Sequence, residues 1–389
     1  MDLPRALDVH PAFLPPGTRV GPWRVVSRRG RGAYGVVYRA VREGCEPEGF
    51  VALKLAVMER DPRYAREVEV LSRIHHPGVP RPRDQGDWVS PGGRLYPYSA
   101  VEWVDGTPLY EWAFTSHPSM AEMLRVLAQG ARALEATHAA GGVHRDVRGD
   151  NMWVRGLGEH AMLTDFGTGH HKGAEGLPPW PLPPGTSAYR SPESWQFAQR
   201  YGRQRRAQYA ARAADDLFAL GVTAYRLVTE QYPPPTEPSL DRAQVWYVEG
   251  EELTAPIEIN GRVPPELNAL ILRLLSVNPE VRGTARELAE ALERAAQPEE
   301  AAASPRAVKV EEPWQSPAQV PGYKRWFWFA LAAAAVVMPL AMKSPRPEPG
   351  PWGRAEQVQS EGLDGGLEEG GPVETGDEDG LGPATSAPR

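Results

Sequence analysis

The first sixty positions of the chain alternate short apolar runs with turns that contain glycine. Runs rich in β-forming residues fall at positions 23–26, 36–40 and 51–57, and such runs bounded by turn residues are typical of β-strands. This pattern predicts an antiparallel meander. Tyr64, Val68 and Leu71 then recur at helical spacing, which predicts one helix after the third strand.

From position 120 onward the apolar period is that of helices. It predicts helices over residues 120–140, 215–229, 265–275 and 284–295. A small β-rich lobe followed by a larger helical lobe is an α+β architecture with two lobes. With 389 residues and 41% apolar content, the chain has ample material for a sizeable core.

The composition changes after position 296. Residues 297–325 are rich in Pro, Glu, Ala and Ser and are predicted to be a linker with a juxtamembrane end. Residues 326–342 (WFWFALAAAAVVMPLAM) carry no charge, and this length of helix spans about 25 Å of a hydrocarbon core of roughly 30 Å. We therefore predict a transmembrane helix in contact with membrane lipid; an apolar helix packed on the preceding domain is the alternative. Residues 343–389 are predicted to be a disordered, acidic Gly/Pro-rich tail.

The net charge of −7 is concentrated at the end of the chain. Residues 343–389 hold four basic and ten acidic residues, so this tail carries −6 and the remainder only −1. Domains that bind nucleic acid have a clear basic excess, so no nucleic-acid partner is expected. The single cysteine, Cys45, cannot form an internal disulfide and suits a reducing compartment. Because residues 1–20 also lack a signal-peptide pattern, we expect the folded domain in the cytoplasm.

A series of short motifs runs through the predicted two-lobed part. In order they are GRGAYG at 30–35, VALK at 51–54, HRDVRGDN at 144–151, DFG at 165–167 and SPE at 191–193. This order resembles that of the eukaryotic-like protein kinases, more closely the bacterial serine/threonine kinases of that superfamily. The resemblance implies a bilobal kinase domain at residues 20–296 after an extension at 1–19. It also implies ATP and Mg²⁺ at the site and a protein Ser/Thr hydroxyl as acceptor.

The glycines Gly30, Gly32 and Gly35 leave room for the backbone to fold over triphosphate oxygens. A dinucleotide-binding turn would instead open a helix, and here the next run, residues 36–40, is β-rich. Kinase geometry is therefore favoured for this turn.

Lys54 lies in an apolar strand, where a buried ammonium needs a partner. Glu67 follows Tyr64 by three residues and precedes Leu71 by four, so it lies on the inward face of the predicted helix, whereas Glu69 faces away. By resemblance, Lys54 and Glu67 form the pair that positions the α- and β-phosphates.

Residues 98–106 (YSAVEWVDG) resemble the hinge between kinase lobes. The resemblance implies a gatekeeper at Val101, adenine contacts from the Glu102 carbonyl and the Val104 backbone, and Val37 and Ala52 above the ring. Ordinary core packing explains these apolar residues almost as well.

The motif at 144–151 supplies the chemistry that the resemblance implies. Asp146 accepts the proton of the substrate hydroxyl, and Asn151 with Asp165 holds two Mg²⁺ ions. Arg145 is implied to be a structural cation that faces the activation segment, and His144 a packed histidine.

Two positions depart from the family pattern. Arg148 stands where serine/threonine kinases usually have Lys, which keeps the charge but changes its reach. Trp153 stands where the family usually has a smaller apolar residue under the adenine, and it either stacks on the purine or crowds it.

The segment after DFG indicates the acceptor class and the scaffold. Gly185 and Thr186 resemble the serine/threonine signature, in which the threonine braces the catalytic aspartate. By resemblance Glu193 pairs with Arg282, and Asp216 anchors the catalytic loop from a buried helix. Few hydroxyls occur between residues 165 and 193, so activation by phosphorylation of this loop is not evident.

The sequence as a whole indicates a serine/threonine protein kinase anchored in the cell (inner) membrane by one span, with its catalytic domain in the cytoplasm. A catalytically weak pseudokinase that acts as a membrane scaffold is one alternative, kept open by Arg148 and Trp153. A small-molecule kinase of similar fold is another, and the protein-substrate motifs at 185–186 and 191–193 argue against it.

Overall fold

The computed structural model describes residues 8–297, except 33, 46–48, 157, 175–181, 183–184, 205–206 and 235–252. All described residues belong to one unit, Met1–Ser304. The predicted linker, the apolar segment 326–342 and the acidic tail lie outside the described residues. Within the described part, none of the helices combines the length and the apolar character that crossing a membrane requires.

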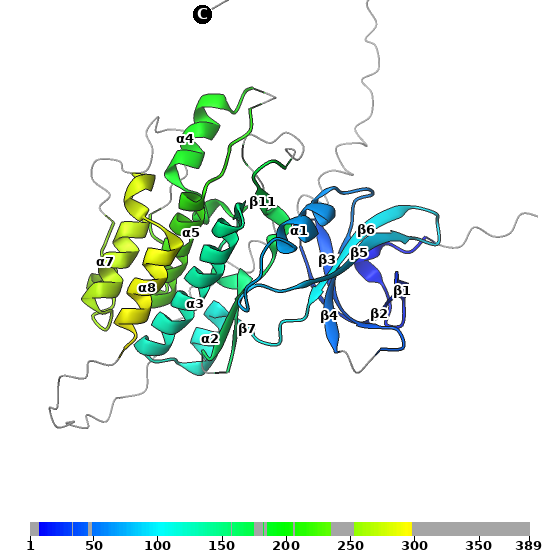
Figure 1. Ribbon diagram of the computed structural model, residues 1–389, viewed down its shortest axis with the longest axis horizontal. Helices are drawn as coiled ribbons and strands as arrows, with labels where there is room; N and C mark the ends of the chain where they lie inside the picture. Colours follow the sequence, from blue (N-terminus) through cyan, green and yellow to red (C-terminus); the bar gives the residue numbers. More distant parts are fainter. Residues whose placement is uncertain are drawn as a thin grey trace, which may run out of the picture. The chain divides into compact units, whose positions relative to one another are not determined.

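An antiparallel six-stranded sheet forms the first lobe, drawn in blue to cyan in Figure 1. The three β-rich runs of the sequence are confirmed as β2, β3 and β4, which pair in that order. β6 then pairs with β4 on one side and β5 on the other. The strands are β1 (Arg19–Val20), β2 (Trp23–Arg31), β3 (Gly35–Arg42), β4 (Phe50–Ala56), β5 (Pro82–Val89) and β6 (Leu95–Glu102).

The segment before the first strand packs on this sheet. A short 3-10 helix, η1 (Pro11–Phe13), buries Ala12 completely. The hydroxyl of Tyr38 in β3 donates to the Pro11 carbonyl (2.7 Å) and accepts from the Leu14 amide (3.0 Å). The stretch predicted as an extension thus contributes to the core of the first lobe from Pro11 onward.

The helix predicted after the third strand is confirmed as α1 (Arg63–Leu71). Its buried face includes Tyr64, Glu67, Val70 and Leu71, the spacing that one helical face requires. Val70 and Leu71 belong to the core of the second lobe, whereas Tyr64 reaches the glycine turn of the first. α1 therefore touches both lobes.

The second lobe is helical, and the four helices predicted for it are present with ends within two residues of those expected. Figure 1 shows α3, α5, α7 and α8 packed side by side. Capping boxes start α3 at Ser119 and α8 at Thr284. The helices are α2 (Leu109–Ser116), α3 (Met120–Ala139), α4 (Pro192–Tyr201), α5 (Ala213–Thr229), α6 (Pro256–Ile259), α7 (Pro265–Leu274) and α8 (Ala285–Ala295).

Short strands and 3-10 turns hold the motif-bearing loops between the lobes. β9 (Met152–Arg155) pairs with β7 (Thr107–Pro108) and β10 (His160–Leu163), and β8 (Gly142–Val143) pairs with β11 (His170–His171). The loop at 144–151 leaves β8 and enters β9, and DFG lies between β10 and β11. The two motifs are thereby brought side by side. The 3-10 turns are η3 (Gly149–Asn151), η4 (Phe166–Thr168), η5 (Ser187–Tyr189) and η6 (Pro279–Arg282).

Candidate active site

Lys54 of β4 forms ion pairs with two carboxylates. Its Nζ bonds to Glu67 of α1 and lies 2.9 Å from Asp165 Oδ1. Burial lowers the pKa of this ammonium, but the carboxylates of Asp165 and Glu67 outweigh it, so the pKa lies above its usual value. The ammonium is therefore a fixed positive charge beside Asp165.

The predicted choice of Glu67 over Glu69 is confirmed. Glu67 is 2% exposed and also accepts a hydrogen bond from the buried Ser99 hydroxyl (3.0 Å). Glu69 lies on the outer side of α1, where it pairs with Arg66 (3.2 Å) and with His171 (2.6 Å). The Glu67 carboxylate is thus held from both sides, by Lys54 and by Ser99.

Asp216 of α5 anchors the catalytic loop, as the sequence predicts. Its carboxylate accepts from the backbone amides of His144 and Arg145, both at 2.8 Å, and lies 2.9 Å from His138 Nε2. Burial raises the pKa of Asp216, and the contacts with His138 and His144 more than compensate, so the pKa is lowered. These bonds hold Arg145 at φ 70°, a left-handed conformation that is uncommon outside glycine.

His144 is packed as the resemblance implies, and the role of Arg145 stays a prediction. His144 is fully buried, packs edge to face on Phe166 with ring centroids 4.5 Å apart, and lies 2.9 Å from the Thr164 carbonyl through Nε2. Burial lowers the pKa of the Arg145 guanidinium to about 10, although the nearby Asp216 carboxylate opposes this shift. Among the residues that the structure describes, the side chains of His144 and Arg145 form no hydrogen bond with the Asp165 carboxylate.

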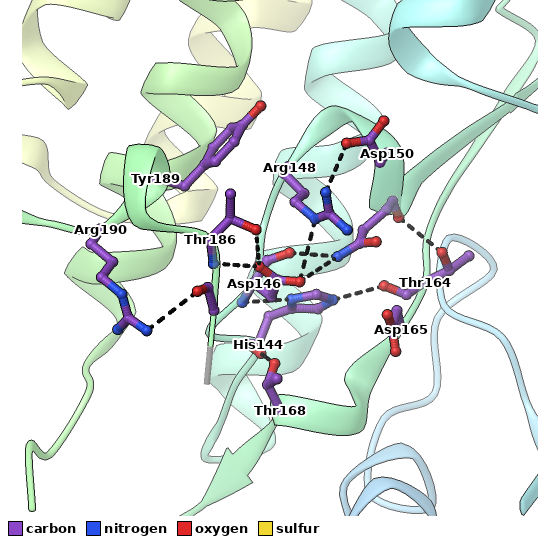
Figure 2. Close-up of polar contacts among 12 residues, drawn as sticks. His144, Asp146, Arg148, Asp150, Thr164, Asp165, Thr168, Thr186, Tyr189 and Arg190 are labelled. Atoms are coloured by element: carbon purple, nitrogen blue, oxygen red, sulfur yellow. Dashed lines mark hydrogen bonds and ion pairs between the residues drawn. The ribbon is translucent and has the colours of Figure 1, made fainter. Parts of the chain in front are cut away.

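The Asp146 carboxylate is held by four groups. Oδ1 accepts from the amide and the hydroxyl of Thr186, both at 3.3 Å. Oδ2 accepts from Asn151 Nδ2 (3.0 Å) and lies 3.4 Å from Arg148 Nε. Figure 2 shows this carboxylate between Thr186 and Arg148. The predicted brace from Thr186 is therefore present, and Asp146 has a single defined orientation.

Arg148 lies between two carboxylates of its own loop. In addition to its contact with Asp146, its Nη1 donates to Asp150 Oδ2 (2.8 Å). Burial opposes its charge, but Asp146, Asp150 and Asp165 outweigh burial and raise its pKa. The cation expected at this position is therefore present beside Asp146, the expected proton acceptor, in a fork that a lysine does not have.

Asp165 and Asn151 are connected through the residue between their motifs. The amide and hydroxyl of Thr164 donate to the Asn151 carbonyl at 2.7 and 3.0 Å. The positive charge of Lys54 lowers the pKa of Asp165, so this carboxylate is anionic at neutral pH. Its side chain is 52% exposed and its φ is 64°.

These two side chains fit a magnesium site. Mg²⁺ in nucleotide enzymes is usually held by one or two protein oxygen ligands together with substrate phosphates. Asp165 offers an open, anionic carboxylate, and Asn151 has its amide nitrogen bound to Asp146 (carbonyl, 2.8 Å), so its oxygen is the remaining ligand atom. Among the described residues no cluster of three or more His, Cys, Asp or Glu side chains could hold a metal without phosphates.

The three glycines of the predicted phosphate turn have different roles in the structure. A Cβ at Gly30 would meet nothing within 4 Å, so the space next to this residue is open. A Cβ at Gly35 would instead lie 1.8 Å from the Tyr64 hydroxyl and 2.8 Å from the Leu55 carbonyl. Gly35 is therefore also required for the packing of α1 against the sheet. At Gly32 the nearest atom to such a Cβ is the Gly35 carbonyl oxygen, at 3.9 Å.

The predicted hinge, residues 98–106, comprises the end of β6 and the residues that follow this strand. Val101 is 5% exposed and lies opposite Ala52 of β4. Glu102 is the last residue of β6, and its amide donates to the Arg81 carbonyl (2.8 Å). Val104, in the segment after β6, is half-buried. Val37 and Ala52 are also half-buried. These placements agree with the residues implied for an adenine site, and their contact with a nucleotide stays a prediction.

The scaffold pair predicted from the sequence is present. Arg282 is completely buried and bonds to both oxygens of Glu193, at 2.7 and 2.8 Å. It also donates to the carbonyls of Ser276 (3.0 Å) and Ala214 (2.9 Å). This pair joins α4 and η6 to the start of α5, the helix that carries Asp216.

Sequence reasoning missed the neighbours of Trp153. The guanidinium of Arg29, on β2, lies 5.3 Å from the centre of the Trp153 ring and 6.0 Å from that of Trp103. Ser99 and His138, which hold Glu67 and Asp216, were also missed. The sequence does place Arg29 directly before Gly30, next to the glycine turn, and this position could have indicated that Arg29 lies near the site.

Comparisons with known proteins agree with this geometry. The chain matches the model of the protein kinase domain over residues 23–292. It is 31% identical over 321 residues to the serine/threonine-protein kinase PkaA of Streptomyces coelicolor, across 75% of this chain and 54% of the relative. It is 28% identical over 270 residues to the serine/threonine-protein kinase PknA of Mycobacterium tuberculosis, across 68% and 59%.

A third relative is the serine/threonine-protein kinase Pkn1 of Myxococcus xanthus, 31% identical over 276 residues, which are 68% of this chain and 37% of the relative. The chain thus spans about half the length of the curated relatives it matches. The family match itself covers more than half of the chain and contains every motif of the site. The chain belongs to the protein kinase domain family.

Proposed function

We propose that this protein transfers the γ-phosphate of ATP to serine and threonine hydroxyls of proteins. The observation that carries the proposal is the convergence of Lys54, Asp146, Asn151 and Asp165, drawn from three separate segments, with Lys54 paired to Asp165 and Asn151 paired to Asp146. The names of the relatives, all serine/threonine-protein kinases, support the acceptor class.

Each of these residues has a defined task in this reaction. Lys54, kept charged and fixed by Glu67, binds phosphate oxygens of the nucleotide. Asp165 and Asn151 bind Mg²⁺, which when bound neutralises phosphate charge and orients the leaving group. Asp146 orients the acceptor hydroxyl and takes its proton. Its rigid setting between Thr186 and Asn151 fixes the direction from which the hydroxyl approaches.

Arg148 places a positive charge next to the path of the transferring phosphate. Its contact with Asp146 keeps the guanidinium within the site, and Asp150 holds it from the other side. A preorganised cation of this kind stabilises charge that develops during transfer. Arg148 therefore serves in place of the lysine that the family usually has, which disfavours the pseudokinase alternative.

An assay of the full chain with radiolabelled ATP and a generic protein substrate tests the proposal. We expect label on phosphoserine and phosphothreonine, and loss of labelling when EDTA removes Mg²⁺, because without the metal the anionic Asp165 carboxylate repels the triphosphate. Label confined to phosphotyrosine would contradict the acceptor class. ATP binding without any transfer to protein would instead support the pseudokinase scaffold.

We further propose that residues 326–342 anchor the protein in the inner membrane as one span, with the kinase domain in the cytoplasm. The proposal is supported by the uncharged run, by Tyr323 and the tryptophans at its start, and by Lys324 and Arg325 on the kinase side. A membrane anchor would hold the catalytic domain near substrates at the same surface.

The full chain is expected to sediment with membranes and to resist extraction by high salt or alkaline carbonate, whereas a chain ending at Ala296 stays soluble. Ala334→Arg, near the centre of the run, should add about 2.5–3.5 kcal/mol to the cost of insertion and release part of the protein. Recovery of the full chain wholly in the soluble fraction, without detergent, would contradict the anchor.

A further inference from the structure

A cation on the glycine-bearing strand contacts an indole on the opposite lobe. Arg29 belongs to β2 of the sheet and Trp153 to β9, which packs with the helical lobe. The distance of 5.3 Å from the guanidinium carbon to the Trp153 ring centre lies within the range of a cation–π contact. Trp103, in the linker between the lobes, is the second ring near the same guanidinium, at 6.0 Å.

The residues next to Arg29 and Trp153 show where the two side chains point. Arg28, the residue before, donates to the Ala12 carbonyl (3.5 Å), so it points to the face of the sheet that η1 covers. Arg29 itself falls at a bulge, between the Arg28–Tyr38 and Gly30–Val37 pairs of β2 and β3, and its guanidinium reaches the two indoles. In β9, Met152 and Val154 are each 1% exposed in the helical core, so Trp153 between them points away from that core.

The side chain of Arg29 is exposed, and its guanidinium lies near two aromatic rings. Among the residues that the structure describes, no carboxylate forms an ion pair with Arg29, and its recorded neighbours are the two indoles. Trp103 is shared with a second guanidinium, that of Arg39 (5.3 Å), which itself covers Phe50 (3.4 Å). Rings and guanidinium groups therefore alternate in one row, in the order Phe50, Arg39, Trp103, Arg29 and Trp153.

The contact between Arg29 and Trp153 lies where the adenine of ATP is expected to bind. The adenine is expected between Val37 and Ala52 above and residue 153 below, and Arg29 now covers the face of Trp153. A base stacked on an indole needs ring centres about 4.5–7 Å apart. A guanidinium at 5.3 Å from the same ring leaves no room for a base between the two. Binding of the base must therefore separate Arg29 from Trp153.

We propose that Arg29 and Trp153 form a base clamp that closes on itself in the free protein and on a purine in the complex. The purine takes the face of Trp153, and the Arg29 guanidinium covers the other face of the base. Aromatic rings and guanidinium planes both stack on nucleobases and read the π face rather than the edge. The base clamp rests on the proposed function, the binding of ATP. In it, the base is recognised by stacking on Arg29 and Trp153 in addition to apolar packing.

The clamp is tested on the full chain by calorimetric titration with Mg²⁺–ATP and with Mg²⁺–tripolyphosphate, which has no base. We expect Arg29→Leu and Trp153→Leu each to weaken ATP binding about fivefold, the scale of one stacking or cation–π contact, and to leave tripolyphosphate binding unchanged. Trp153→Phe, which keeps a ring, should retain most of the ATP affinity. The double variant should lose less than the product of the two single losses, because both residues act on one base.

Arg28→Leu is the matched control, because it removes the neighbouring arginine, whose guanidinium contacts the Ala12 carbonyl instead of an indole, and it should leave ATP affinity unchanged. ATP affinity that is unchanged in Arg29→Leu would overturn the clamp. Tighter ATP binding by Arg29→Leu would also overturn it, because Arg29 would then only obstruct the base. Failure of the wild-type chain to bind ATP at all would instead overturn the proposed function and the clamp with it.

Discussion

Asp146→Asn is expected to reduce phosphoryl transfer at least about a hundredfold while ATP binding stays nearly intact. The substitution keeps the size of the side chain, so Thr186 still has an oxygen to donate to at Oδ1. The amide has no proton affinity comparable to that of the carboxylate, so the acceptor hydroxyl loses its base. Turnover of a protein substrate and calorimetric ATP binding, measured on the same preparation, check both halves of the expectation.

Asp165→Asn is the informative comparison for this variant. Asp165 is the open carboxylate beside Lys54, so removing its charge should weaken Mg²⁺–ATP binding as well as transfer. The two aspartates thus separate chemistry from binding. Equal turnover by wild type and Asp146→Asn would show that another group takes the proton.

Arg282→Ala is expected to lower the free energy of unfolding by about 3–5 kcal/mol, the cost of removing one partner of a buried ion pair. The guanidinium is completely buried, and its loss leaves the Glu193 carboxylate and the carbonyls of Ser276 and Ala214 without their donor. The cavity beside Phe218, whose ring lies 4.9 Å from the guanidinium carbon, adds to the loss. Chemical denaturation of the two proteins measures the difference.

Arg286→Ala is the matched control because it removes an arginine of the same region that is 69% exposed and pairs with Glu135 (2.6 Å). Exposed pairs contribute about 0–1 kcal/mol, so this variant should unfold almost as the wild type does. Similar losses for Arg282→Ala and Arg286→Ala would mean that burial of the Glu193 pair does not determine its contribution.

The contacts that the sequence predicted well are of two kinds. Glu67 was identified because helical spacing decides which face a residue occupies, and that rule acts over one turn of α1. The Glu193–Arg282 pair and the anchor at Asp216 join residues far apart in the chain, and they were predicted only because the motifs resemble a known family. Local periodicity contains no information on which distant helix a buried charge will meet.

The contacts that the sequence did not predict depend on packing between lobes. Arg29 is exposed, and nothing in its strand pattern indicates that its guanidinium reaches Trp153 of β9. Trp153 was recognised as unusual, but whether it stacks or crowds depends on what faces it. The packing of Pro11–Leu14 on the sheet was missed for a similar reason, since Tyr38 supplies both hydrogen bonds from the middle of β3.

The contact between α1 and the glycine turn has a thermodynamic consequence. The Tyr64 hydroxyl donates to the Tyr34 carbonyl (3.2 Å), and the Arg63 guanidinium covers the Tyr34 ring at 3.5 Å. A nucleotide that orders the turn therefore favours the position of α1 in which Glu67 meets Lys54. Linkage between two binding equilibria is reciprocal. A partner that binds the protein with α1 away from the sheet must therefore weaken the affinity for the nucleotide by the same factor by which the nucleotide weakens the affinity for that partner.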